Sequence, residues 1–152
     1  MKKQSGFTLI ELLLVLAIIG IIAAIAIPAL LGQREKAKAK ATQSMVANIA
    51  GELARVNDDL RQTGTTPTAA AVVTAVLKLS NYNFPAAKNP YGGSTAPYTA
   101  AAAGTTLGLV YLTANSTYSD PATSKTYPAV VVTATYKDGT TTPKVTKVVA
   151  LD

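Results

Sequence analysis

Apolar residues are concentrated in the first 31 positions of this chain and then become periodic. Residues 12–31 form an almost unbroken apolar run, and a helix of about 20 such residues can cross a bilayer. Between Ala37 and Leu60, apolar residues recur every three or four positions, which is typical of one face of a helix. We therefore expect one helix from about residue 8 to residue 62, roughly 80 Å long. Gly64 is its expected stop, and its first half must find neighbours outside its own domain.

The pattern after Gly64 is shorter and mixed. Residues 68–79 predict a second helix, with Thr66 or Thr68 as its cap. Asn89-Pro90-Tyr91-Gly92-Gly93 is a strong turn signal. Asp138-Gly139 suits a hairpin between the last two of three expected strands, which are residues 107–113, 129–137 and 145–151.

Together these elements predict an α+β fold. The amphipathic half of the long N-terminal helix would cover the apolar face of a small antiparallel sheet. At 152 residues, the chain has room for one domain plus an anchor. We expect a leader over residues 1–6, a transmembrane or assembly helix over 7–32, an amphipathic helix half over 33–64, a helix–loop connection over 65–106 and an antiparallel sheet over 107–152.

Two residues weaken the apolar half of the helix. Pro28 lacks an N–H and leaves the carbonyl of Ala24 without its helical partner. Gly20 costs about 1 kcal/mol relative to Ala in a water-exposed helix. The segment between Gly20 and Pro28 is therefore where we expect this helix to kink or unwind.

The composition argues against catalytic and metal chemistry. The chain has no Cys and no His, so it lacks a thiol nucleophile and the commonest general base and metal ligand. We expect no enzyme activity, no cofactor and no metal site. Asp120 and Asp138 are too few for calcium, which takes about six to eight oxygen ligands.

The charge pattern is basic, with a formal net charge of +6. Four basic residues follow the apolar run closely. We interpret this cluster as a solvated helix face or a contact with lipid headgroups, and it supports DNA binding only weakly. The cluster consists of Arg34, Lys36, Lys38 and Lys40.

Glu11 stands at the head of the apolar run. An ionised group in hydrocarbon costs on the order of 3 kcal/mol or more, so such a residue is expected to have a partner. The alternative is that Glu11 is simply tolerated near the membrane interface. The residues around it decide between these interpretations.

The stretch Gly6-Phe7-Thr8-Leu9-Ile10-Glu11, preceded by Lys2 and Lys3 and followed by the apolar run, resembles the N-terminus of a type IV pilin precursor. The resemblance is close over residues 1–32 and extends to the rest of the chain only in architecture. It implies cleavage between Gly6 and Phe7 by a prepilin peptidase, which also N-methylates Phe7. It further implies that Glu11 and Thr8 serve assembly, and that the helix unwinds between Gly20 and Pro28 in a filament.

The implied chemistry agrees with elementary electrostatics. Cleavage creates an α-amine on Phe7 with an ordinary pKa of about 7.7–8.0. Amine and carboxylate each bear a desolvation cost in an apolar bundle, and pairing offsets much of it. We therefore expect Glu11 to pair with the Phe7 amine of a neighbouring subunit. The basic residues flanking the apolar run do not by themselves place the N-terminus in the cytoplasm; the resemblance implies that orientation.

The resemblance implies a structural protein that polymerises with itself into a pilus for adhesion, motility or DNA uptake. Its expected partners are the prepilin peptidase, the pilus assembly platform and the inner membrane, with a cell-surface filament as the end state. The alternative is a major pseudopilin of a type II secretion system. The turn at residues 89–93 supports that alternative, and the missing acidic calcium loop of those proteins opposes it. An anchored binding domain or an enzyme is the third hypothesis.

Asn115-Ser116-Thr117 fits the N-glycosylation sequon, a triplet that often arises by chance.

Overall fold

The computed structural model describes residues 6–78, 88–92 and 98–151. The predicted leader residues 1–5, Leu79 of the predicted second helix and Gly93 of the predicted turn lie outside these ranges. The chain divides into an N-terminal unit that ends at Glu35 and a larger unit that begins at Lys36. Helix α1 (Leu9–Gln62) contributes residues to both units and confirms the predicted long helix.

The N-terminal unit contains the first half of α1 and buries almost nothing. An 18-residue stretch of α1 is long and apolar enough to cross a membrane, and none of that stretch is buried. Large apolar side chains are exposed around the whole helix, from Leu9 at 75% to Leu31 at 57%. Lipid or other protein chains must therefore cover this segment.

The end of α1 has the geometry of a Schellman motif. The N–H of Thr65 donates to the carbonyl of Leu60 at 3.3 Å, and the N–H of Gly64 donates to that of Arg61 at 2.9 Å. Gly64 itself is left-handed, with φ at +78°. The predicted stop at Gly64 is therefore confirmed.

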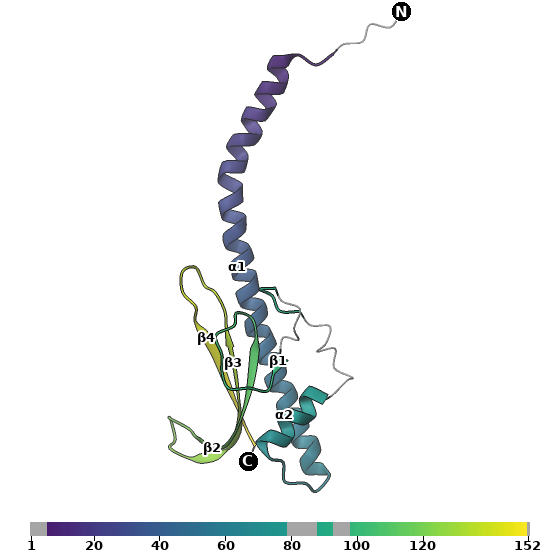
Figure 1. Ribbon diagram of the computed structural model, residues 1–152, viewed down its shortest axis with the longest axis vertical. Coiled ribbons are helices and arrows are strands. Elements are labelled where there is room, and N and C mark those ends of the chain that lie inside the picture. Colours follow the sequence, from purple (N-terminus) through teal and green to yellow (C-terminus); the bar gives the residue numbers. More distant parts are fainter. Residues whose placement is uncertain (1–5, 79–87, 93–97, 152) are drawn as a thin grey trace, which may run out of the picture. The chain divides into compact units, whose positions relative to one another are not determined.

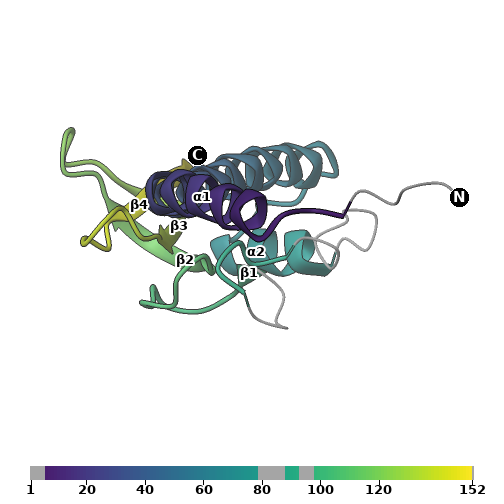
Figure 2. The same ribbon diagram turned by 90° about the horizontal axis from the view of Figure 1, so that it is seen from above.

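Helix α2 (Ala69–Lys78) begins at a capping threonine. The Oγ1 of Thr68 accepts the N–H of Ala71 at 3.2 Å, as the sequence predicts. Figures 1 and 2 show α2 beside the second half of α1, near the strands β1 and β2. Its buried residues are Ala69, Val72, Val73 and Val76.

The sheet has four strands in the order β1-β2-β3-β4 (Figure 1). Strands β2, β3 and β4 form the predicted antiparallel meander, but β1 pairs parallel to β2. The predicted α+β fold and meander are therefore confirmed, and β1 adds an unpredicted parallel strand, because a strand of two residues gives no periodic signal. The strands are β1 (Tyr98–Thr99), β2 (Val110–Ser119), β3 (Thr126–Thr135) and β4 (Lys144–Ala150).

Strand β2 lies later in the chain than predicted. Leu107 forms only an isolated bridge to Thr135, and the N–H of Gly108 donates to the carbonyl of the same Thr135 at 2.8 Å. The polar end of β2 up to Ser119 was not predicted, because its side chains are mostly exposed and lack an apolar alternation. It is held by backbone pairing with the start of β3, after a register shift between Asn115 and Tyr118.

The predicted hairpin turn forms between β3 and β4, with its two central residues shifted by one position to Gly139 and Thr140. Asp138 and Thr141 form an antiparallel bridge, and the N–H of Asp138 donates to the carbonyl of Thr141 at 2.9 Å. Gly139 occupies the first central position with φ at +61°. Thr140, the second central residue, does not have a positive φ, and this combination defines a type II′ turn, which favours Gly at the first central position.

The hydrophobic core lies within the larger unit. The second half of α1, helix α2 and one face of the sheet supply it, so each element buries its apolar side against the other two. The C-terminal segment is tied to this core, because Nη2 of Arg61 donates to the carbonyl of Leu151 at 2.7 Å. The largest fully buried side chains are Ile49, Leu53, Leu112, Val46, Val72, Val76, Val110, Val130 and Val132.

Candidate processing and assembly site

The predicted cleavage site lies in extended, exposed chain before α1 begins. Gly6 and Phe7 precede the helix, and the Phe7 side chain is 86% exposed. A Cβ built on Gly6 would meet no atom within 4 Å. In the part of the chain that the structure describes, nothing therefore requires glycine at position 6. A requirement for glycine would have to come from another molecule that binds this bond.

Thr8 caps the first turn of α1. Its Oγ1 accepts the N–H of Glu11 at 3.3 Å, which satisfies one of the backbone donors left free at a helix start. Thr8 and Glu11 are three residues apart, as the Thr and Glu of a capping box are. The carboxylate of Glu11 in this first turn also interacts favourably with the helix dipole.

The carboxylate of Glu11 has no hydrogen-bond or ion-pair partner among the described residues. Residues around it on α1 are apolar and exposed, with Ile10 at 74% and Leu12 at 59%. Any apolar environment that covers them would also surround Glu11. An unpaired carboxylate in such an environment is costly, so the geometry leaves Glu11 available for a cation from outside the chain.

Gly20 and Pro28 both lie inside continuous helix. A Cβ built on Gly20 would meet no atom within 4 Å. The predicted unwinding is absent from the isolated chain and stays a prediction for the assembled state. The missing N–H of Pro28 makes this part of the helix easier to open, because the Ala24 carbonyl has already lost its usual partner.

The comparisons concern mainly the N-terminal part of the chain. Residues 1–27 match the protein family described as the prokaryotic N-terminal methylation motif. This part of the chain is similar to the N-termini of type IV pilins and pseudopilins.

Relatives of both kinds resemble this pilin-like chain. The type II secretion system core protein G of Vibrio cholerae is 50% identical over 48 residues, which are 31% of this chain and 33% of that protein. A fimbrial protein of Pseudomonas aeruginosa is 79% identical over 28 residues, 18% of each chain. The type IV major alpha-pilin of Moraxella bovis is 50% identical over 54 residues, 36% of this chain and 30% of that protein.

Each similarity therefore spans about a third or less of the relative. No solved structure matches the chain significantly. The matches support the prepilin-type N-terminus.

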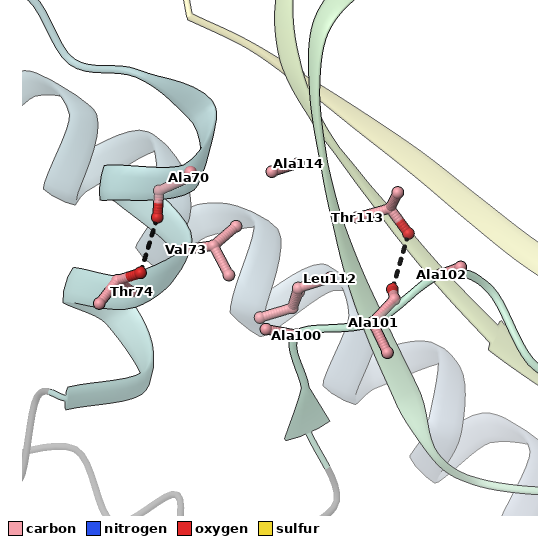
Figure 3. Close-up of a pocket in the computed structure, with 9 residues that line it drawn as sticks. All are labelled: Ala70, Val73, Thr74, Ala100, Ala101, Ala102, Leu112, Thr113 and Ala114. Carbon is pink, nitrogen blue, oxygen red and sulfur yellow. Dashed lines mark hydrogen bonds between the residues drawn. The ribbon is translucent and has the colours of Figure 1, made fainter.

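The larger unit of the pilin-like chain has an apolar groove of about 290 Å³ between α2 and β2 (Figure 3). Two threonine hydroxyls line it, and both donate hydrogen bonds to backbone carbonyls. Thr74 donates to Ala70 at 2.8 Å, and Thr113 donates to Ala101 at 2.9 Å. No titratable side chain lines the groove, so its lining offers no acid, base or nucleophile. The lining residues are Ala70, Val73, Thr74, Ala100, Ala101, Ala102, Leu112, Thr113 and Ala114.

Asp120 organises the turn between β2 and β3. One carboxylate oxygen accepts the N–H of Ala122 at 2.9 Å, and the other accepts the hydroxyl of Thr123 at 2.7 Å. These two bonds hold the pKa of the Asp120 carboxyl below its ordinary value. Asp120 thus has a local structural role, and Asp138 lies in a different hairpin. The structure does not bring the two carboxylates together as parts of one site within the described ranges.

The sequon residue Asn115 lies at the register shift of β2. Its Oδ1 accepts the N–H of Thr117 at 3.1 Å, so the amide helps to shape the bulge. Sugar attachment there stays untested.

Sequence reasoning proposed roles for Gly6, Phe7 and Glu11 but missed how α1 begins. The spacing of Thr8 and Glu11 carried the signal for a helix cap. Glu11 was interpreted for its charge and not for its place in the first turn of the helix. Both roles can coexist, because the cap uses the backbone N–H of Glu11 and leaves its carboxylate available.

Proposed function

We propose that this chain is the structural subunit of a type IV pilus. The precursor is anchored in the inner membrane by the apolar half of α1, cut between Gly6 and Phe7, and methylated on the Phe7 amine by the prepilin peptidase. It then polymerises with copies of itself at the assembly platform into a cell-surface filament. The observation that carries this proposal is the exposed apolar half of α1, headed by Glu11 within a matched methylation motif.

The exposure of this segment explains why a filament outside the membrane would have to bury it. Apolar surface left in water costs roughly 25 cal/mol per Å², and large side chains around the whole circumference of α1 are uncovered. Lipid covers them in the precursor. In a filament, the same segments of neighbouring copies cover one another without any change in the folded core.

Glu11 and the Phe7 amine would set the register between subunits. Apolar contacts alone tolerate sliding, whereas a carboxylate and an amine offset each other's desolvation only when they meet. Thr8 fixes the backbone between them, so both groups are presented from an ordered helix end. The pair is expected to select one axial offset rather than to add much net stability.

The test compares three replacements at the start of α1. Glu11→Ala removes the charge, and Glu11→Gln removes it but keeps a side chain that can take part in a capping box. Thr8→Ala removes the cap, at a cost of about 1 kcal/mol to the helix end. Filament yield is measured by electron microscopy of sheared surface material, and membrane insertion by alkaline extraction.

We expect both Glu11 variants to insert normally and to lose most of their filaments, because each leaves a buried amine unpaired. Such unpaired buried charges cost about 3–5 kcal/mol. Thr8→Ala is expected to lower the yield less. Normal filaments from Glu11→Gln would overturn charge pairing and leave capping as the role of Glu11. Mass spectrometry of the filament should show a chain that starts at N-methyl-Phe7.

A second candidate function is the major pseudopilin of a type II secretion system. It is favoured by the relatives named type II secretion system core protein G, of which the Vibrio cholerae and Escherichia coli proteins are each 50% identical to this chain over the matched residues. A pseudopilin would carry the same processed N-terminus. Long filaments on the cell surface would decide for the pilus.

An enzymatic role has little support. The relatives are named as fimbrial, pilin or secretion-system core proteins, and the chain has neither His nor Cys. Adhesion, motility and DNA uptake are all compatible roles for such a filament. The basic cluster after the apolar run gives DNA contact only weak support.

A further inference from the structure

Two lysines of the basic cluster share a groove with a hairpin that lies about 100 residues later in the chain. Lys36, Lys40 and Gln43 are spaced by four and three residues, so they lie on one face of α1. Tyr136 and Asp138, from the connection between β3 and β4, line the same groove of about 260 Å³. The whole groove belongs to the larger unit.

Lys38 makes a contact with an aromatic ring, unlike Lys36 and Lys40. Its Nζ lies 5.5 Å from the centre of the Tyr91 ring, a cation–π contact. The Tyr91 hydroxyl is itself fixed, because it accepts the N–H of Lys137 at 2.9 Å. Lys36 and Lys40 are exposed, and among the described residues neither ammonium has an ion-pair partner. They are the two members of the cluster that line this groove and can bind an anion in it.

The backbone positions of these lysines lie just beyond the polar layer of a membrane, on the side away from the apolar run. At 1.5 Å per residue, Lys36 and Lys40 lie about 7.5 and 13.5 Å beyond Leu31, where the apolar run ends. Each headgroup layer is roughly 5–7 Å thick, and a lysine stem can reach several ångström further toward it. Tyrosine side chains such as Tyr136 also favour this layer.

We propose that Lys36 and Lys40 bind the phosphate of an anionic phospholipid and so fix the depth of the precursor in the membrane. This inference rests on the membrane anchoring in the proposed function. Two ammonium groups and the carboxylate of Asp138 give the groove one net positive charge. Asp138 repels a phosphate, so the phosphate lies on the α1 side of the groove.

The test uses the full chain in nanodiscs of equal parts phosphatidylcholine and phosphatidylglycerol. Native mass spectrometry measures the ratio of the two lipids that stay bound. A lysine near an anionic surface contributes about 1 kcal/mol, which is roughly a fivefold preference. We expect this preference for phosphatidylglycerol to fall about fivefold in Lys36→Gln or Lys40→Gln and about 30-fold in the double variant.

Two further variants make the result specific to the groove. Lys78→Gln with Lys125→Gln removes the same charge from exposed sites outside the groove and should leave the ratio unchanged. Asp138→Asn removes the opposing carboxylate and should raise the phosphatidylglycerol preference. The variant keeps the turn, because Gly139 stays in place and the structure uses only the backbone of Asp138 for its bonds to Thr141.

An unchanged lipid ratio in the double variant would overturn the inference while leaving the anchoring intact. Failure of the unaltered chain to insert would overturn both the anchoring and the inference. A gel-shift assay with duplex DNA tests the alternative that the two lysines bind nucleic acid. Loss of DNA binding in the double variant, with the lipid ratio unchanged, would assign the two lysines to nucleic acid instead.

Discussion

Gly64 shows how a single residue sets the boundary between helix and loop. It is left-handed, and a Cβ built on it would meet no atom within 4 Å. Any cost of a larger residue there must come from the backbone rather than from crowding. A left-handed conformation costs a residue with a Cβ about 1–2 kcal/mol.

We predict that Gly64→Ala lowers the free energy of unfolding of the larger unit by about 1 kcal/mol. Gly51 offers the matched control, because it lies inside α1, is exposed, and also has open space around a built Cβ. Gly51→Ala should raise the same free energy by up to about 1 kcal/mol. Urea unfolding of the full chain in detergent, followed by circular dichroism, measures both. Equal effects of the same sign would contradict the assignment of a left-handed stop to Gly64.

Local signals of this kind explain which residues were predictable. The stop at Gly64, the cap at Thr68 and the turn at Asp138-Gly139 each depend on a few neighbouring residues, and all three formed, the turn with its central residues one position later than predicted. Of the candidate site, the motif indicated Gly6, Phe7 and Glu11. The sequence could not show which lysine of the basic cluster makes a cation–π contact, because the partner ring of Lys38 is Tyr91, which is far away in the chain.

At the scale of elements, the turn at Asn89–Gly92 connects several segments that are distant in sequence. The Nδ2 of Asn89 donates to the carbonyl of Leu107 at 2.9 Å, and its Oδ1 accepts the N–H of Tyr91 at 2.9 Å. Gly108 packs so closely that a Cβ on it would collide with the Asn89 side chain. The Tyr91 hydroxyl in turn forms hydrogen bonds with the backbone of Lys137, which lies just after the end of β3.

Replacement of Tyr91 by Phe should therefore destabilise this arrangement. The hydroxyl accepts the Lys137 N–H at 2.9 Å and donates to the Lys137 carbonyl at 3.3 Å, so its loss removes two part-buried hydrogen bonds. We expect Tyr91→Phe to lower the free energy of unfolding by about 1–2 kcal/mol, while the ring that faces Lys38 remains.

The matched control for that prediction is Tyr118→Phe. The Tyr118 ring lies 5.8 Å from that of Tyr127, and within the described residues its hydroxyl makes no hydrogen bond. We expect a change within about 0.5 kcal/mol, as for most surface substitutions. Similar losses in both variants, measured by urea unfolding, would show that the Tyr91 hydroxyl has no special role.

The elements that sequence reasoning misplaced or missed are those whose sequence carries little periodic signal. The polar end of β2 and the two residues of β1 carry little apolar periodicity, and their partners determine their extent. Long helices behave differently, because every turn of α1 repeats the same signal. This is why the bounds of α1 were predicted closely while β2 was placed too early.

At the scale of the whole chain, the two units satisfy their apolar residues in different ways. The larger unit encloses a core formed by α1, α2 and the sheet. The apolar stretch of the N-terminal unit buries none of its surface. The larger unit can therefore hold its fold whether the apolar stretch lies in lipid or among other subunits, which is what passage from membrane to filament would require.

Calcium dependence is the whole-molecule property that separates the two candidate assemblies. The resemblance to secretion pseudopilins implies an acidic calcium loop, whereas the described residues contain no group of three or more candidate metal ligands. Calcium at a hundred times its dissociation constant would stabilise a bound fold by about 2.7 kcal/mol. For a domain of this size, that shifts the thermal midpoint by roughly 5–20 °C.

We predict that the full chain in detergent unfolds at the same temperature, within about 1 °C, in millimolar calcium and in EDTA. Asp120 already satisfies both of its carboxylate oxygens within its own turn, so calcium binding there would have to break bonds that hold the loop. Differential scanning calorimetry provides the measurement, with magnesium as the control for ionic strength. A calcium-specific rise of 5 °C or more would favour the secretion pseudopilin. An unchanged midpoint together with long surface filaments would favour the pilus.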